Sequence, residues 1–167
     1  AMKALRMLRL GYSLTARVMS YPHPVIVACG GHSLAMGDFL MLSADYVNGS
    51  RGDFTIATNE VAIGMTMPRV AAATLRNRLQ PAAFQRAVTL SEFFDPESAL
   101  QAGFFDELVG PEELMSRAEA LANTSLQLDS QAHTVSKRRI RKKLIRKIRR
   151  SVPLDLVDAA LVGLRGR

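Results

Sequence analysis

The sequence predicts an α/β fold from three features in its first half. Residues 25–29 (VIVAC) form a short, apolar run rich in β-branched side chains, which is typical of a strand buried on both faces. A double glycine then leads into residues 34–44, a stretch rich in Leu, Met and Ala that predicts a helix with Ser33 as its N-cap. Two further strand-like runs follow at 46–48 and 54–57, joined by a Gly-Ser-Arg-Gly-Asp turn. Strand, helix and strand in this order indicate βαβ units.

The other elements follow from helix and turn signals. Apolar residues at helical spacing predict an amphipathic helix over residues 2–20, which ends where Pro22 and Pro24 push the chain toward extended geometry. Prolines, caps and periodicity then predict, in order, helices over 68–79, 81–90, 95–103 and 111–122, a polar loop over 123–130, a basic helix over 136–150 and a short apolar helix after Pro153.

Composition bounds the class of protein. The chain has 167 residues, 48% of them hydrophobic and 22% charged, which suits one globular domain. Its single cysteine, Cys29, lies in an expected buried strand, so we expect no disulfide framework. No apolar run is long enough to span a bilayer, and Arg6 and Arg9 interrupt the first apolar stretch where a signal peptide would need continuity. These features predict a cytoplasmic protein.

The turn after the first strand is the first candidate site. A glycine turn that enters a helix points unpaired backbone N–H groups at one spot, and the helix dipole adds positive potential there. Such a spot suits a phosphate, or an oxyanion developing on a carbonyl.

The stretch PVIVACGGHSLAMGDFLMLSADYVNGSRGDFTIATNEVAIGMTMP resembles the central segment of the enoyl-CoA hydratase/isomerase (crotonase) family. Gly31, Gly37, the Ala44-Asp45 pair, Asn59-Glu60 and Gly64 lie at matching spacing, and the likeness runs over about residues 22–135. The resemblance implies a crotonase-like α/β core over 1–132 and a C-terminal helical segment over 133–167. Family members also carry a portion with the first strands and one oxyanion-hole N–H, for which this sequence shows no counterpart.

The same resemblance implies the site residues. The backbone N–H of Met36, beside Gly37, takes the place of the family's second oxyanion donor, and Glu60 that of its second catalytic glutamate. A structural alternative makes Glu60 a helix- or loop-capping residue. The substrate-binding positions implied are Gly31, His32, Leu34, Phe39, Ile63 and Met65.

Phe39 stands where the family has its first catalytic glutamate, and phenylalanine cannot transfer a proton. The adjacent Asp38 points about 100° away around the helix, so we expect it to be an exposed acid in the first turn rather than a substitute. One carboxylate suffices to move a proton between two carbons, whereas adding water across a double bond more naturally uses two. The sequence therefore keeps isomerase-like chemistry open and puts hydratase chemistry in doubt.

Basic residues concentrate in one segment. Ten lysines and arginines lie within residues 137–150, and removing them from the formal net charge of +7 leaves −3. Ile140, Leu144, Ile145 and Ile148 form an apolar stripe, with the charges expected on the other faces. The favoured interpretation is a solvated helix packed on the domain or on a neighbouring subunit; the second is that some charges hold the phosphates of CoA, as family members do. Nucleic acid or anionic membrane is not expected as a partner, because no aromatic residues are interleaved with the charges.

Taken together, the resemblance implies an acyl-CoA enzyme of the hydratase/isomerase type that stabilises an enolate and moves a proton with Glu60. Coenzyme A would enter as part of the substrate, with no permanently bound cofactor and no metal, and the family implies a homotrimer or a dimer of trimers. The alternative is a catalytically degenerate relative that serves as a CoA-binding or assembly protein.

Overall fold

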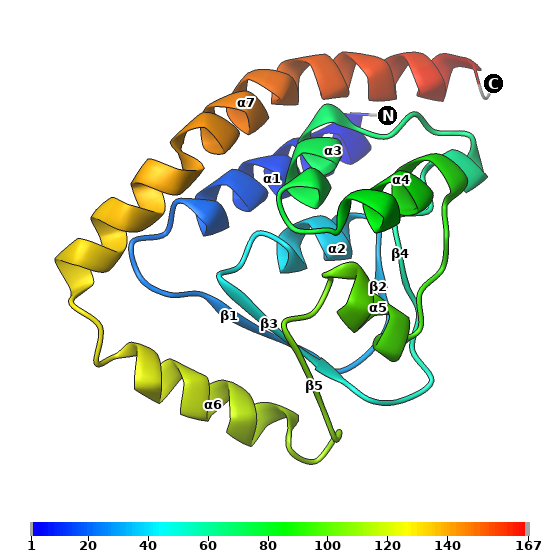
Figure 1. Cartoon of the computed structure of the whole chain (residues 1–167). Coiled ribbons are helices and arrows are strands. Elements are labelled where there is room, and N and C mark those ends of the chain that lie inside the picture. The colour runs from blue at the N-terminus through cyan, green and yellow to red at the C-terminus, as the bar shows by residue number, and fades with distance from the viewer. Residues whose placement is uncertain (1, 166–167) are drawn as a thin grey trace.

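The computed structural model describes residues 2–165 and places helices around two small parallel sheets (Figure 1). The elements are α1 (Met2–Met19), β1 (Ile26–Cys29), β2 (Ser33–Leu34), α2 (Met36–Met41), β3 (Tyr46–Ser50), β4 (Ile56–Ala57), a 3₁₀ turn η1 (Val61–Ile63), α3 (Arg69–Arg76), α4 (Pro81–Leu90), α5 (Pro96–Ala102), β5 (Glu107–Val109), α6 (Leu114–Ser125) and α7 (Ser130–Arg165).

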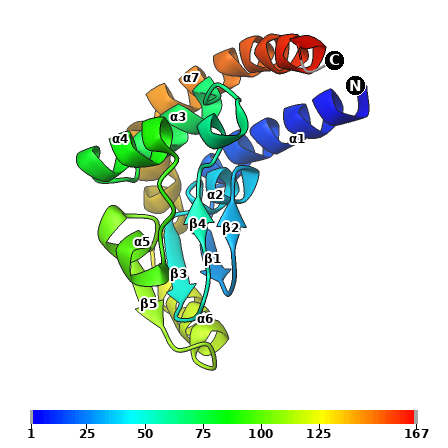
Figure 2. The ribbon, with the colours of Figure 1, turned by 90° about the vertical axis from the view of Figure 1, so that its right-hand side faces the viewer.

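The larger sheet has the order β1-β3-β5 and is parallel throughout. Ile26 pairs with Tyr46 and Asn48 with Glu107, so β3 is the central strand. The smaller sheet pairs β2 with β4 in parallel, and Ile56 adds an antiparallel bridge to Phe94. Figure 2 shows the strands of both sheets standing side by side, with α5 to their left. The predicted α/β class and the strands at 25–29, 46–48 and 54–57 are confirmed, within a residue or two at their ends.

A layer of helices closes one side of the molecule. α7 runs along both α1 and α3, so segments from opposite ends of the sequence lie side by side (Figure 1). The interface is apolar at its centre, where Tyr12 and Met19 of α1 and Ile148 of α7 are almost fully buried. α6 lies on the opposite side, against β1 and β3. The boundary expected after residue 132 falls inside α7.

Caps fix α5 as the sequence predicts. The side chain of Asp95 accepts a hydrogen bond from the Ser98 amide at 2.7 Å, and Gly103 ends the helix with φ of 95°. A Cβ at Gly103 would lie 2.8 Å from the carbonyl oxygen of Arg78, so both conformation and space require glycine here. Phe104, directly after the turn, is fully buried against Phe94.

The helix expected over 34–44 is shorter than predicted. Ser33 is not its N-cap but part of β2, and α2 begins only at Met36, after Ala35 at φ of 50°. The cause is pairing with β4: the Ser33 amide donates to the Thr55 carbonyl at 3.0 Å and the Ala35 amide to the Ala57 carbonyl at 3.1 Å. These bonds hold the chain extended where its composition favours helix.

Three expectations for the C-terminal third are also wrong. The loop expected over 123–130 is shorter and covers only residues 126–129, because α6 continues to Ser125 and α7 begins at Ser130. Pro153 does not separate two helices but lies inside α7, where contacts with α1 and α3 hold the helix together on both sides of it. Ile140 is 79% exposed, so the apolar stripe consists of Ile145 and Ile148 with partly buried Leu144.

Candidate active site

The turn between β2 and α2 presents a free backbone N–H. Met36 is the first residue of α2, where no carbonyl of its own helix can accept its N–H. Among the hydrogen bonds of residues 2–165 its N–H has no acceptor. Ala35 adopts a positive φ that favours glycine, which costs about 1–3 kcal/mol and persists only where surrounding contacts enforce it. The turn therefore has the local geometry predicted for an oxyanion donor.

The side chain of Met36 closes this turn against α1. The end of this side chain lies over Gly11, where a Cβ would be 2.7 Å from the Met36 methyl carbon and 2.8 Å from its sulfur. Gly37 follows with an exposed backbone. The orientation of the Met36 amide is thus fixed from both sides, by β2–β4 pairing and by packing on α1.

Glu60 lies on a loop that is anchored to α4. It precedes η1, and its carbonyl accepts hydrogen bonds from the Ile63 amide at 3.2 Å and the Met65 amide at 2.8 Å. Thr58 donates to the Ala87 carbonyl, and the Ser91 hydroxyl accepts from the Ala62 amide at 3.0 Å. The loop therefore presents Glu60 from a fixed backbone.

The Glu60 carboxyl is almost completely buried, with 4% of the residue exposed. Its Oε2 has no hydrogen-bond partner among the described residues. Burial raises the pKa of Glu60, since the charged form loses hydration. A carboxyl group whose pKa is moved toward neutrality can both accept and return a proton. As a capping residue it fails, because its side chain makes no hydrogen bond to η1.

Asp38 is not the exposed acid that the sequence analysis expected. It is completely buried, and neither carboxyl oxygen has a hydrogen-bond partner within residues 2–165. Burial raises the pKa of Asp38 to about 8; the neighbouring Ser33 hydroxyl acts in the opposite direction, and the negative charge of Glu60 raises it further. The expectation was wrong because α2 is one turn shorter, and its first turn is covered by neighbouring elements instead of solvent. Burial therefore favours the protonated, uncharged form of Asp38.

Two comparisons with known proteins identify the family and the fold. The family model described as enoyl-CoA hydratase/isomerase matches residues 7–156. The chain belongs to this family. A crystal structure of an enoyl-CoA hydratase/isomerase family protein from Pseudomonas syringae superimposes with a TM-score of 0.90 at 42% identity, covering 93% of this chain and 68% of that chain. The fold is thus the crotonase-type α/β fold.

Two further relatives carry more specific names. An enoyl-CoA isomerase from Mycobacterium tuberculosis, solved in its apo form, has a TM-score of 0.88 and 41% identity over 92% of this chain and 68% of that chain. A probable enoyl-CoA hydratase of the same organism, EchA17, is 31% identical over 110 residues, which is 65% of this chain. The chain spans about two fifths of the length of that curated relative, 41%.

The remaining predicted positions fall into two groups. Phe39, at the family's first glutamate position, is 2% exposed and belongs to the hydrophobic core. The other positions lie nearer the surface: His32, Leu34 and Ile63 are exposed, and Gly31 and Met65 are half-buried. His32 accepts a hydrogen bond from the Thr55 amide through Nδ1 at 3.0 Å. The acidic neighbour on which the charge of Glu60 acts is Asp38.

Sequence reasoning also missed a buried ion cluster. Lys137 and Arg141, expected on the solvated faces of the basic helix, are 5% and 9% exposed. Both reach Asp45, Lys137 at 2.5 Å and Arg141 at 3.1 Å. Arg141 also donates to the Ala44 carbonyl at 2.9 Å, so these charges tie α7 to the end of α2. One signal in the sequence could have revealed this cluster. Lys137 and Arg141 are four residues apart, so they share one helix face, and a carboxylate such as Asp45 is a suitable partner for that face.

No group of His, Cys, Asp and Glu in the described part of the chain could hold a metal ion. Over the same residues, none of the helices combines the length and the apolar character needed to traverse a bilayer.

Proposed function

We propose that this chain carries the acid/base half of an enoyl-CoA isomerase site, with Glu60 as the proton carrier and the Met36 N–H as an oxyanion donor. The single observation that supports the proposal most is Glu60 itself, a buried carboxyl with an unpartnered oxygen on a rigid loop. The M. tuberculosis relative named an isomerase, at 41% identity, is consistent with this reaction class, and relatives at 43% identity are named enoyl-CoA hydratases, so the choice rests on the residues.

The proposed reaction moves a double bond by one position. The Glu60 carboxylate takes a proton from the carbon next to the thioester carbonyl of a 3-enoyl-CoA. The released electron pair shifts into the carbonyl, whose oxygen gains negative charge and accepts a hydrogen bond from the Met36 N–H. Glu60 then returns the proton to the fourth carbon of the acyl chain, leaving a double bond conjugated with the carbonyl. Atoms and charge balance with no cofactor, and coenzyme A is only the carrier of the acyl group.

Isomerisation is favoured over hydration because the chain offers one carboxylate for proton transfer. Phe39 has no group that can transfer a proton, and the carboxyl group of Asp38 is completely buried in the first turn of α2. Addition of water needs one group to activate the water and another to protonate the carbon, so it uses two active carboxyls.

Glu60→Gln is the direct test, because glutamine keeps the shape and removes the titrating group. We expect isomerase turnover, followed by ultraviolet absorbance of the conjugated product, to fall by about 10²–10⁴-fold while binding of an acyl-CoA changes little. Glu112→Gln, at an exposed glutamate beyond β5, is the matched control and should keep full turnover. Survival of activity in Glu60→Gln would remove Glu60 from the mechanism.

The oxyanion role of Met36 is separable from its packing. Met36→Pro deletes the N–H at the first helical position, where proline is tolerated, and Met36→Ala keeps the N–H but removes the contact with Gly11. We expect the proline variant to lose about 10²–10³-fold in turnover and the alanine variant far less. Equal losses would mean that packing alone matters.

A degenerate, non-catalytic relative is the alternative, and the phenylalanine in place of the family's first glutamate favours it. Calorimetric titration with an acyl-CoA and with free CoA separates the two. Thioester binding without isomerase or hydratase turnover would support the alternative, whereas turnover that depends on Glu60 supports the enzyme. We further propose, from the family alone, that the chain assembles as a homotrimer or a dimer of trimers.

A further inference from the structure

The ten cations of residues 137–150 divide into two groups. Lys137 and Arg141 point inward and are neutralised by Asp45. The other eight are exposed, and none forms an ion pair with a carboxylate of residues 2–165. These eight, the outer cations, are Arg138, Arg139, Lys142, Lys143, Arg146, Lys147, Arg149 and Arg150.

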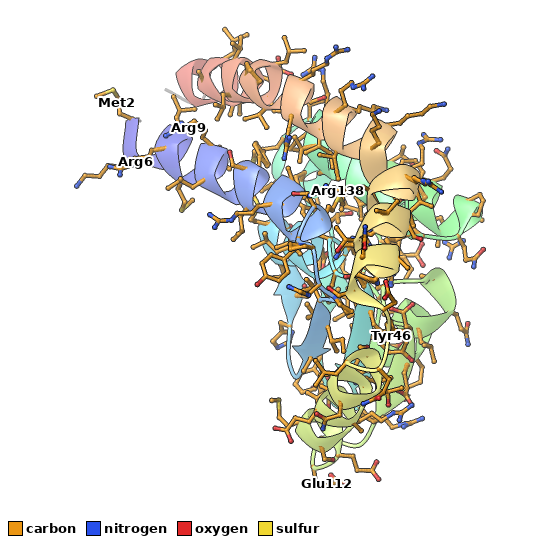
Figure 3. The ribbon with its side chains drawn as sticks, turned by 90° about the vertical axis from the view of Figure 1, so that its left-hand side faces the viewer. Met2, Arg6, Arg9, Tyr46, Glu112 and Arg138 are labelled. Atoms are coloured by element: carbon orange, nitrogen blue, oxygen red, sulfur yellow. The ribbon has the colours of Figure 1, made fainter. Side chains whose placement is uncertain are left out.

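Six of the outer cations line one groove beside the end of α1. This groove has a volume of about 860 Å³, and its other lining residues are Ser20, Val135 and Ile145. A second groove of about 440 Å³ adjoins it, sharing Ser20 and Arg149 and adding Arg9 and Arg17 from α1. No carboxylate lines either groove. Figure 3 shows this side of the molecule, with Arg9 on α1 and Arg138 on α7.

The outer cations destabilise α7 as an isolated helix. Arg138 and Lys142, and Lys142 and Arg146, stand four residues apart, so like charges repel along one face. The inward face already anchors α7 through Ile145, Ile148 and the Asp45 cluster, so the outer cations are not needed for packing. A cation-lined groove without internal counter-charges matches a ligand that brings several negative charges.

Side-chain chemistry indicates phosphates. Five of the six groove cations are arginines, whose planar guanidinium groups bind phosphate oxygens bidentately. The stretch from Arg138 to Arg150 is about 18 Å long at the helical rise per residue, and a nucleic-acid duplex presents about ten phosphates over that length. Neither groove is lined by an aromatic residue that could stack on a base, so contacts would be to the backbone and independent of sequence.

A membrane fits this face less well. Helices that lie on anionic bilayers bury an apolar face beside their basic one. In this part of α7, Ile145 and Ile148 are packed on the domain, and the exposed apolar residues are only Val135 and Ile140, too few to form a continuous apolar face.

We propose that the groove between α7 and the end of α1 binds the phosphodiester backbone of a nucleic-acid duplex without sequence specificity. From the sequence, nucleic acid is not expected as a partner, because no aromatic residues are interleaved with the charges. Aromatic residues stack on unpaired bases, and contacts to the backbone of a duplex do not require them. None of the groove residues belongs to the β2–α2 turn or to the Glu60 loop. Free CoA, whose phosphates are the other ligand expected for these cations, is therefore the competitor to add: displacement of the duplex by micromolar CoA would assign the groove to CoA instead.

The test uses the full chain and a fluorescently labelled 20-base-pair duplex, in DNA and RNA forms, with anisotropy measured between 50 and 200 mM salt. We expect saturable binding at low salt, equal for scrambled sequences, and an affinity that falls steeply with salt. Arg139→Ser/Arg146→Ser should weaken binding at least tenfold and reduce the logarithmic salt slope by about 2. The matched control, Lys3→Ser/Arg6→Ser, removes the same charge outside both grooves and should lose much less.

Three further outcomes would overturn the proposal: no binding at 50 mM salt, equal losses in the two double variants, or retention on phosphatidylglycerol vesicles with no duplex binding. Isomerase turnover measured on the same samples keeps the two proposals separate, because both double variants should leave it unchanged.

Discussion

Asp38→Asn tests whether a carboxyl group is buried without a partner. Asparagine has nearly the same shape but cannot ionise. In the wild type, the pKa of Asp38 is raised to about 8 by burial, by comparison with 3.8 for an aspartate in solvent. Below pH 4 both the folded and the unfolded chain hold this proton, so the group has no pH-dependent effect there. Between pH 4 and 8 the unfolded chain releases the proton and the folded chain keeps it, so stability falls as the pH rises.

The size of the effect follows from the shift. Each pKa unit corresponds to about 1.4 kcal/mol, so the wild type should lose up to about 5 kcal/mol of unfolding free energy between pH 4 and 8 from this group. Asp38→Asn removes that contribution. The variant should match the wild type at pH 4 to 5 and exceed it increasingly up to pH 8, with unfolding free energies taken from urea titrations followed by circular dichroism.

Asp53→Asn, at an exposed aspartate, is the control, and its curve should stay parallel to that of the wild type. Burial of Glu60 also lowers the unfolding free energy as the pH rises, and it does so in the wild type and in both variants. A difference between Asp38→Asn and the wild type therefore reports on Asp38. The reasoning is refuted if Asp38→Asn and the wild type change with pH in parallel, because Asp38 would then be hydrated or hydrogen-bonded in the folded state.

Three further variants test the packing that positions the site. Gly103→Ala should lower the unfolding free energy by about 1–3 kcal/mol, because the residue has φ of 95° and the new Cβ meets the Arg78 carbonyl at 2.8 Å. Asp155→Asn should cost about 1–3 kcal/mol, since this buried carboxylate accepts hydrogen bonds from two amides at the start of α3. Lys137→Met should cost about 3 kcal/mol by leaving Asp45 without its closest cation, and thermal unfolding measures all three.

Each of these variants has a matched control. Gly64→Ala also has a positive φ of 77° but open space around the new Cβ, so it should cost less than Gly103→Ala. Asp158→Asn removes only the half-exposed partner of Arg69 and should cost less than 1 kcal/mol. Adding Asp45→Asn to Lys137→Met should recover part of the loss; a double variant that is less stable than the single one would contradict the account.

Much of the fold could be predicted because its signals are local. The apolar run of β1, the prolines that begin α4 and α5, and the glycine at 103 each act on their immediate neighbours in the chain. Where the sequence misled, a distant contact decided the outcome. β2 exists because Ser33 and Ala35 pair with the segment around residues 55–57, against the helical preference of the stretch.

The candidate site was predictable to the extent that it depends on backbone position. Met36 and Glu60 followed from spacing within a family pattern, and both lie in turns whose geometry suits the roles expected of them. The burial of Asp38 could not be predicted. Helical periodicity tells on which side of α2 a residue lies, but not whether solvent or another element lies on that side. Burial of Lys137 and Arg141 was hidden for the same reason: a run of ten cations does not reveal which two face a carboxylate.

The packing of α1 against α7 affects how the chain is made. Arg141 donates to the carbonyl of Met19, a residue 122 positions earlier. At a translation rate of 5–20 residues per second, α1 must wait on the order of ten seconds before its partner helix is synthesised. During that interval the apolar face around Tyr12 and Met19 is uncovered. The nascent chain therefore has a period of vulnerability to aggregation that ends only when α7 docks, and chaperone dependence should be greatest for variants that slow this last step.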